Sequence, residues 1–182
     1  MYILRSLIFL CAIFSLSFNY TPESGAYHYI NKYRDLAIVE MYRSGIPASI
    51  TLAQALHETN YGTSKLATIA KNHFGIKCKS NWIGDTYFHR DDDYDNRGNL
   101  IKSCFRSYDI DIDSYVDHSN FLMSRPRYSM LFQYDQTDYV SWAHGLKSSG
   151  YATDPRYAEK LIAKVKRYGL DEYDRWDNPL TK

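Results

Sequence analysis

Glu58 has the surroundings that general acid chemistry asks of a carboxyl group. The residues before it, from Ile50 to His57, are mostly apolar, and their spacing predicts a helix that ends near Asn60. The negative end of the helix dipole and the apolar neighbours both disfavour a carboxylate anion. A carboxyl group that stays protonated suits proton donation, although an ordinary exposed glutamate at a helix end fits the same spacing.

A second group of carboxylates follows in the run Asp91, Asp92 and Asp93, and Asp92 stands 34 positions after Glu58. A carboxylate opposite a protonated acid is the usual pair for cleaving a glycosidic bond. A solvated acidic loop or a weak cation site explains the same composition. Because the sequence gives no distance between the carboxyl groups, it does not choose between inverting and retaining chemistry.

The sequence does not contain a complete motif of the other common catalytic classes. His57 and Glu58 begin the pattern of a zinc protease, but Tyr61 stands where its second histidine is needed. The sequence has no G-x-S-x-G serine elbow and no glycine-rich phosphate loop. We therefore expect neither a catalytic metal nor a cofactor.

The composition indicates one globular domain. The chain has 182 residues, and its 22 Lys and Arg nearly balance 21 Asp and Glu, so the net charge of +1 does not favour a nucleic-acid partner. It contains 18 tyrosines, whose flat apolar face and polar tip suit polar ring-shaped ligands. An aromatic core and surface would account for them too.

The N-terminal segment, residues 1–18, has the pattern of a targeting signal. Its single charge, Arg5, precedes an apolar run from Leu7 to Phe18 that is shorter than the about 20 residues of a bilayer span. This length is typical of a secretory signal; an uncleaved anchor or a buried helix is the alternative. We expect an exported domain over residues 19–182 with no stable membrane span.

Export affects what is expected of the cysteines, because removal of the signal would leave only Cys78 and Cys104. A cysteine pair in an exported domain favours a disulfide, with two buried thiols as the alternative. Neither cysteine belongs to a C-x-x-C pair, so a zinc site is not favoured.

Periodicity predicts a mainly α architecture. Helical spacing and stop or start signals predict helices near residues 30–41, 47–60, 64–71, 112–122, 138–147 and 154–169. Glycines punctuate the middle of the chain, with β-prone pieces near residues 85–88 and 101–108 around a turn at 96–99. We expect a helical body carrying a small β-containing lobe, that is, an α+β fold in the mainly α class.

Several blocks of the sequence resemble one family. The segment SGIPASITLAQALHETNYG, residues 44–62, resembles the signature of bacterial peptidoglycan N-acetylglucosaminidases, which include autolysins and flagellar hydrolases. The resemblance covers about residues 28–170 in order. Its further blocks are SKLA at 64–67, NHFGIKC at 72–78, CFRSY at 104–108, DHSNFL at 117–122, RPRY at 125–128 and WAHGLKSSGYATDPRYA at 142–158.

The resemblance implies a lysozyme-like fold and an endo-β-N-acetylglucosaminidase that hydrolyses the β-1,4 bond after N-acetylglucosamine in peptidoglycan. It places the general acid at Glu58 and a second acidic residue in the β lobe, where many members have Glu. This sequence offers only Asp there, so we favour Asp92 and then Asp93, unless the 2-acetamido group of the substrate assists instead. The resemblance also places Tyr151 in the active site.

Further residues of these blocks are expected to shape the sugar cleft or support it. The candidates for the cleft are Asn60, Phe74, Trp142 and Tyr157; Phe74 and Trp142 fit a core position equally well. His118 and His144 are expected to be hydrogen-bonded inside the helical body.

Two other classes of function stay open. A wall-binding protein without turnover is favoured by the missing glutamate of the lobe. A muramidase or lytic transglycosylase on the same fold would cut the other glycan bond. In each case the partner is peptidoglycan, and we expect an exported monomer that is periplasmic, or secreted to the cell envelope.

Overall fold

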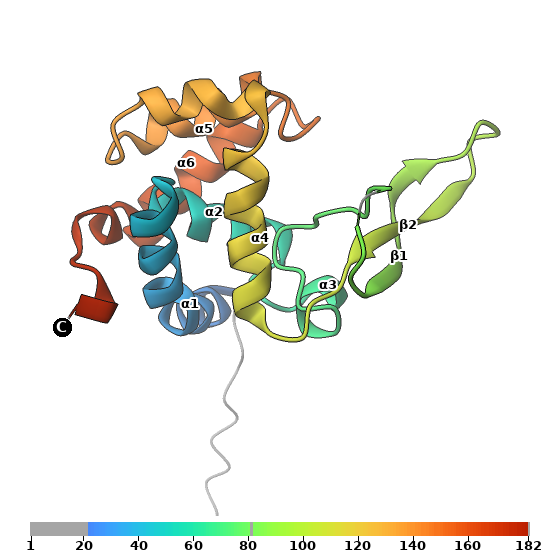
Figure 1. Cartoon of the computed structure of the whole chain (residues 1–182), viewed down its shortest axis with the longest axis horizontal. Coiled ribbons are helices and arrows are strands. Elements are labelled where there is room, and N and C mark those ends of the chain that lie inside the picture. Colours follow the sequence, from blue (N-terminus) through green and yellow to red (C-terminus); the bar gives the residue numbers. More distant parts are fainter. Residues whose placement is uncertain (1–21, 81, 182) are drawn as a thin grey trace, which may run out of the picture.

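The computed structural model describes residues 22–80 and 82–181, so the predicted signal segment at residues 1–18 lies outside the described part. A helical body carries a two-stranded hairpin that projects to one side (Figure 1). In chain order the elements are α1 (Pro22–Ser44), α2 (Ala48–Glu58), α3 (Lys65–Thr68), β1 (Thr86–Tyr94), β2 (Leu100–Arg106), α4 (Asp111–Met123), η1 (Pro126–Gln133), α5 (Tyr139–Ser148), α6 (Tyr157–Tyr168), η2 (Leu170–Arg175) and η3 (Pro179–Thr181). The mainly α prediction with a small β lobe is confirmed.

Helix α2 is the centre of the body. Every residue from Ala48 to Leu56 is buried, and α1, α5, α6 and η2 pack around it. A helix that is apolar on most of its sides belongs in a core. Glu58, the last residue of α2, therefore stands where the chain leaves the core and turns toward the surface.

The boundaries of α1 and α2 follow local signals that the sequence contains. Gly45 adopts φ +83°, a left-handed conformation that favours glycine, and its N–H donates to the carbonyl of Met41 to close α1. Pro47 then occupies the N-cap position of α2. The predicted break between the two helices is confirmed.

The segment that precedes the hairpin of β1 and β2 pairs with β2. Lys77 pairs antiparallel with Phe105, and the N–H of Cys78 donates to the carbonyl of Cys104 at 2.9 Å. The side chains of Cys78 and Cys104 form a disulfide, with the Cα atoms 5.3 Å apart. The predicted disulfide is confirmed, and it ties the hairpin to the chain beside the core.

The C-terminal part differs from the prediction in two details. Helix α6 begins at Tyr157 rather than at 154–155, because the carboxylate of Asp154 accepts from the N–H of Arg156 and from Lys160, forming a turn before the helix. Beyond α6, Asp174 packs back onto the body and accepts hydrogen bonds from Ser49 N–H at 2.8 Å and Ser49 Oγ at 2.6 Å. Burial raises the pKa of Asp174 to about 6, although both bonds from Ser49 oppose the shift.

None of the helices in residues 22–80 and 82–181 combines the length and the apolar character that crossing a membrane requires.

Candidate active site

A cleft of about 550 Å³ opens where α2 ends. Three segments border it: the chain before the hairpin, the end of α4 with the residues that follow it, and the turn before α6. The lining residues are Glu58, Phe74, Gly75, Ile76, Lys77, Lys79, Phe121, Arg125, Arg127, Tyr151, Ala152 and Thr153. Of the predicted site residues, Glu58, Phe74 and Tyr151 are thus brought together.

The backbone holds Glu58 at the cleft by a tight turn. The hydroxyl of Thr59 donates to the carbonyl of Ala55 at 2.6 Å and accepts from the N–H of Gly62 at 2.7 Å. Across the cleft, Gly75 adopts φ +62°, and a Cβ atom at that position would lie 4.0 Å from Glu58 Oε2. The half-buried carboxyl group of Glu58 therefore lies close to the backbone of Gly75.

Two tyrosines form an aromatic wall beside Glu58. Tyr151 lines the cleft, and the ring of Tyr157 stacks behind it with centroids 5.6 Å apart at 26°. Gln54 Nε2 donates to the buried hydroxyl of Tyr157 at 3.0 Å, which fixes this ring from the core side. Burial and the neighbouring Glu58 charge raise the pKa values of Tyr151 and Tyr157, so both phenols stay protonated and Tyr151 keeps a donor for the cleft.

Another residue of the cleft lining, Phe74, covers the buried His118. Its ring stacks on that of His118, with centroids 3.9 Å apart at 13°. The two ring nitrogens of His118 have no hydrogen-bond partner among the described residues, and burial lowers the pKa of His118 to about 3, which keeps the ring neutral. The prediction that His118 and His144 are hydrogen-bonded inside the body is correct only for the burial of His118; its ring lacks the predicted bonds among the described residues, and His144 is exposed on α5.

Three of the predicted cleft residues lie elsewhere. Asn60 is exposed and donates to Thr63 Oγ1 at 3.1 Å; its φ of +48° shows that it shapes the turn after α2, a conformation that asparagine tolerates. Trp142 is 1% exposed in the core, and its indole N–H donates to the carbonyl of Asp135. Tyr157, also 1% exposed, backs Tyr151 and does not line the cleft.

Asp92 and Asp93 fall in β1, which runs on to Tyr94 instead of ending near residue 88. The pairing of the strands shifts around them: Arg90 pairs with Lys102, whereas Tyr94 pairs with Leu100. Four steps along β1 therefore oppose two steps along β2. Such an irregularity bends a strand and commonly lies next to functional sites.

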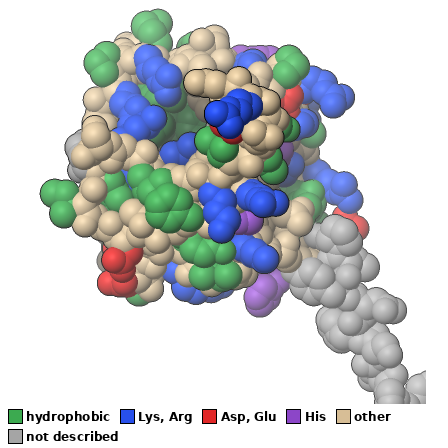
Figure 2. Space-filling model, turned by 90° about the vertical axis from the view of Figure 1, so that its right-hand side faces the viewer, with side chains coloured by type: hydrophobic (Ala, Val, Ile, Leu, Met, Phe, Trp, Pro, Cys, Tyr) green, Lys and Arg blue, Asp and Glu red, His purple; other side chains and the backbone are tan. Residues whose placement is uncertain are grey.

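The basic side chains of the cleft were not predicted from the sequence. Lys77, Lys79, Arg125 and Arg127 line it beside Glu58. Figure 2 shows the face of the molecule on the hairpin side, where Lys and Arg side chains clearly outnumber Asp and Glu. The signal was present in two of the family-like blocks, 72–78 and 125–128, but the near-neutral total charge gave no reason to examine it.

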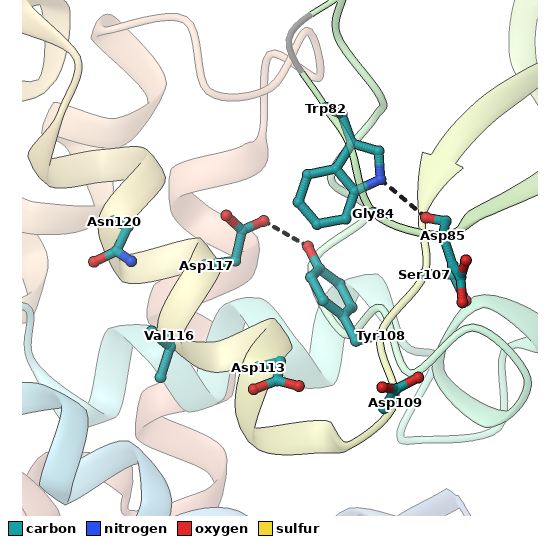
Figure 3. A pocket seen from close by; sticks show the side chains of 10 residues that line it. All are labelled: Trp82, Gly84, Asp85, Ser107, Tyr108, Asp109, Asp113, Val116, Asp117 and Asn120. Atoms are coloured by element: carbon teal, nitrogen blue, oxygen red, sulfur yellow. Dashed lines mark hydrogen bonds between the residues drawn. The ribbon is translucent and has the colours of Figure 1, made fainter.

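A second cavity, of about 480 Å³, lies between α4 and the base of the hairpin (Figure 3). The carboxylate of Asp117 accepts two hydrogen bonds from Arg106 Nη1, both 2.8 Å, and one from the hydroxyl of Tyr108 at 2.6 Å. The guanidinium of Arg106 in turn lies 4.4 Å from the ring centroid of Trp82. These polar groups bind one another.

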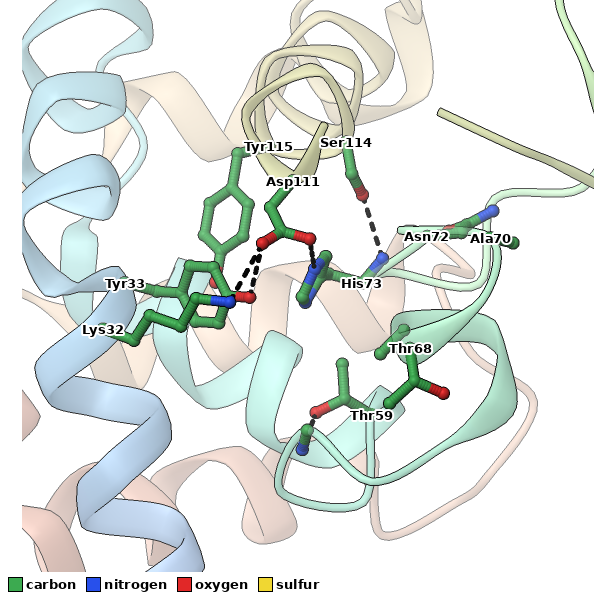
Figure 4. Close-up of polar contacts among 12 residues, drawn as sticks. Lys32, Tyr33, Thr59, Thr68, Ala70, Asn72, His73, Asp111, Ser114 and Tyr115 are labelled. Atoms are coloured by element: carbon green, nitrogen blue, oxygen red, sulfur yellow. Dashed lines mark hydrogen bonds and ion pairs between the residues drawn. The ribbon is translucent and has the colours of Figure 1, made fainter. Parts of the chain in front are cut away.

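A third cluster anchors the start of α4 (Figure 4). The carboxylate of Asp111 accepts from Lys32 at 3.1 Å and from the hydroxyl of Tyr33 at 2.8 Å, and it lies 3.0 Å from His73 Nε2. Burial alone would raise the pKa of Asp111, but these bonds outweigh it and lower the pKa to about 2. The hydroxyl of Tyr29 lies 2.6 Å from His73 Nδ1 and extends the network into the core.

Comparison with known proteins identifies the family. Residues 34–170 match the model of the glucosaminidase family, described as mannosyl-glycoprotein endo-β-N-acetylglucosaminidase. Exo-glucosaminidase LytG of Bacillus subtilis (strain 168) is 36% identical over 132 residues, which cover 69% of the chain and 45% of LytG. The peptidoglycan hydrolase FlgJ of Vibrio parahaemolyticus is 33% identical over 146 residues, which cover 78% of the chain and 46% of FlgJ.

Among solved structures, a mutant of a peptidoglycan hydrolase from Sphingomonas sp. A1 is similar, with a TM-score of 0.69 and 30% identity over 80% of this chain and 96% of that one. The chain spans about half the length of the curated relatives that it matches. The family model itself covers most of the chain, including every residue that lines the cleft. The chain therefore belongs to the glucosaminidase family.

Proposed function

We propose that the chain is a peptidoglycan hydrolase that cleaves the β-1,4 bond after N-acetylglucosamine, with Glu58 as the general acid. The observation that carries the proposal is the placement of Glu58 in a cleft of about 550 Å³ with a tyrosine wall beside it. A cleft of this size suits sugar rings, and tyrosine faces suit their apolar sides. Membership of the family adds the reaction class.

In the proposed reaction, protonated Glu58 gives its proton to the glycosidic oxygen while the bond from that oxygen to the sugar carbon breaks. An oxocarbenium-like transition state develops at that carbon. Water then adds to the carbon, and its proton passes to a base. The products are two shorter strands, one of which has N-acetylglucosamine at its new reducing end.

The base that takes the proton of water has two candidates. Where water attacks directly, we assign the base to Asp92 or Asp93 of β1. Where the 2-acetamido oxygen of the substrate first bonds to the sugar carbon, the carboxylate of Glu58, which has given up its proton, accepts the proton as water opens that intermediate. The protonated hydroxyl of Tyr151 stands beside Glu58 and suits a bond to the acetamido group or to the attacking water. Tyr157 acts behind it as a positioning residue.

We further propose that the protein works in the cell envelope, as an exported monomer. The disulfide between Cys78 and Cys104 supports this location, because disulfides persist mainly in oxidising compartments. The apolar segment at residues 1–18 would provide the export signal.

The test is to incubate the purified chain with peptidoglycan, reduce the products with borohydride and identify the new ends by mass spectrometry. Reduced N-acetylglucosamine ends are expected, and Glu58→Gln should lower their rate of formation by about a thousandfold, within the range for loss of a general acid. Glu159→Gln, the same chemical change on the exposed first turn of α6, is the matched control and should leave the rate unchanged.

Other products would reject the proposal in distinct ways. Reduced N-acetylmuramic acid ends would indicate a muramidase, and anhydro ends would indicate a lytic transglycosylase. No new ends, with protein that still sediments with the wall, would indicate a binding protein. Release of single sugars from strand ends would replace endo with exo cleavage, the activity that the name of LytG gives for that protein.

A further inference from the structure

The charge of the Glu58 cleft differs from that of the chain as a whole. Of the described residues that line it, Lys77, Lys79, Arg125 and Arg127 are basic and Glu58 alone is acidic. Over the full sequence, 22 basic residues face 21 acidic ones. Average composition therefore does not account for the cations gathered around the proposed general acid.

The cations border the cleft from two sides. Lys77 belongs to the segment that pairs with Phe105 of β2, and its ammonium lies 5.7 Å from the ring centroid of Phe105. Arg125 and Arg127 follow the C-terminal end of α4 on the other side. A ligand seated in the cleft would thus meet positive charge on both walls.

Arg125 and Arg127 are held by aromatic rings. The guanidinium carbon of Arg125 lies 3.8 Å from the ring centroid of Phe121, and that of Arg127 lies 4.7 Å from the centroid of Tyr128. Arg127 Nη2 also donates to the hydroxyl of Tyr128 at 2.7 Å. Among the residues whose side chains the structure describes, which leave out residues 91–93, neither arginine forms an ion pair with a carboxylate.

This arrangement orients the guanidinium groups by stacking rather than by ion pairs with the described carboxylates. Each guanidinium carries five N–H donors in a planar fork that matches a carboxylate, and stacking on a ring leaves most of these donors available. Neutral sugars offer these donors only hydroxyl and amide oxygens, whereas a carboxylate takes two parallel charge-assisted bonds from one guanidinium fork, so the arginines favour a carboxylate over a neutral group.

We propose that Arg125 and Arg127 bind carboxylate groups carried by the glycan, so that the cleft prefers acidic strands to neutral ones. The inference rests on the proposed function and adds the substrate class to it. In peptidoglycan the carboxylate has two sources: the lactyl group of N-acetylmuramic acid residues from which the stem peptide has been removed, and the free carboxyl groups of the stem peptides. Neutral β-1,4-linked N-acetylglucosamine has the same backbone but no such group.

The first arm of the test measures binding in the absence of turnover, by calorimetry on the full chain carrying Glu58→Gln. Short strands freed of peptides by an amidase carry lactyl carboxylates; the same strands converted to methylamides are the neutral match. The acidic strands are expected to bind about tenfold more tightly, the size of one charge-assisted bond. Adding Arg125→Gln and Arg127→Gln should remove the difference without weakening binding of the methylamide strands.

The matched control removes two positive charges elsewhere. Lys65→Gln with Lys166→Gln changes exposed residues of α3 and α6 that do not line the cleft, and should keep the tenfold preference. Equal binding of acidic and methylamide strands by the Glu58→Gln chain, both for peptide-free strands and for peptide-bearing ones, would overturn the inference. So would an arginine variant that loses affinity for both strands equally, or a control pair that loses the preference too.

The second arm separates the two sources and the two proposals. A preference that depends on the arginines only with peptide-bearing strands would assign the carboxylate to the stem peptides. A preference with peptide-free strands would assign it to the lactyl group, and both results support the inference. Wild-type protein that binds acidic strands through the arginines but forms no new sugar ends would reject the proposed hydrolysis alone. New ends formed at equal rates from acidic and methylamide strands, with and without stem peptides and bound with equal affinity, would reject this inference alone.

Discussion

Two cavities of similar size border helix α4, and their polar groups are arranged in opposite ways. The cavity beside Trp82, about 480 Å³, contains Asp117, which is bound by Arg106 and Tyr108. In the cleft beside Glu58, about 550 Å³, the guanidinium groups of Arg125 and Arg127 are instead stacked on aromatic rings. Polar groups that bind one another stabilise a fold, whereas oriented groups in a cleft can act on a ligand. Cavity volume alone does not separate the two.

The largest contrast is expected between Glu58→Gln and Asp117→Asn. The first change should remove about three orders of magnitude of activity with little change in stability, because it deletes the proposed proton donor. The second should lower the free energy of unfolding by about 2 kcal/mol, because the amide accepts fewer bonds from Arg106 and Tyr108. Rates on peptidoglycan and urea unfolding of both variants would check the contrast.

The opposite pattern would reverse the assignment of the two cavities. A stable Asp117→Asn protein without activity would place chemistry in the Trp82 cavity. A Glu58→Gln protein that unfolds easily would make Glu58 a structural residue.

The disulfide should have the next largest effect, and on the cleft in particular. It closes a loop with a sequence separation of 26 and holds the segment of Lys77, a cleft wall, against β2. Replacing Cys78 and Cys104 by serine is expected to cost about 3 kcal/mol of stability in the chain-entropy model. Thermal unfolding would measure the loss.

The same variant tests the coupling of hairpin and cleft. At a temperature where it is still folded, its activity should fall because the wall of Lys77 and the strand of Asp92 lose their tether. Full activity in the folded variant would show that the hairpin position does not matter for turnover.

A matched pair of tyrosines sharpens the comparison further. Tyr151 lies beside Glu58 and Tyr108 beside Asp117, so each can lose its hydroxyl group without leaving its neighbours. Tyr151→Phe is expected to lower kcat by about tenfold with unchanged stability, as for a lost hydrogen bond in the transition state. Tyr108→Phe should instead cost about 1 kcal/mol of stability and leave kcat unchanged.

Steady-state kinetics and melting curves on both variants would decide the matter. If Tyr108→Phe lowered kcat as much as Tyr151→Phe, the Trp82 cavity would be part of the catalytic machinery.

The sequence predicted the features that depend on neighbouring residues. The break at Gly45, the helix that delivers Glu58 and the turn at 96–99 follow from local signals, and the structure has all three. Strand β1 was predicted too short because aspartates disfavour strands locally, whereas pairing with β2 carries β1 through them to Tyr94. The resemblance to the family placed Tyr151 with Glu58 in the active site and left Phe74 between cleft and core; the structure brings all three to one cleft.

Orientation in space was harder to predict. Trp142 and Asn60 stand in family-like blocks, but nothing local shows that one faces the core and the other shapes a turn. The basic side chains of the cleft were not predicted, because Lys77 and Arg125 come from segments 48 positions apart and only the fold brings them to one cleft. His118 was expected to have hydrogen-bond partners because buried polar groups usually do.

The smallest predicted effect concerns α4, the wall that both cavities share. Asp111 begins this helix, and its pKa of about 2 lies below the ordinary value near 4 because His73, Tyr33 and Lys32 stabilise the anion. A lowered pKa of an acid stabilises the fold above the ordinary pKa, and this contribution disappears as the pH falls from about 4 toward 2. Asp111→Asn should therefore lower stability by about 1 to 2 kcal/mol at pH 7, after allowance for solvent screening.

The difference between wild type and Asp111→Asn should narrow as the pH falls through that window, as measured by urea unfolding at a series of pH values. Asp113→Asn, an exposed change in the same first turn of α4, is the matched control and should have little effect at any pH. Asp111 anchors α4 but lines neither the Glu58 cleft nor the Trp82 cavity. The activity of folded Asp111→Asn on peptidoglycan at pH 7 should therefore stay within about twofold of the wild-type activity. A constant deficit at every pH would mean that Asp111 contributes by packing rather than by charge.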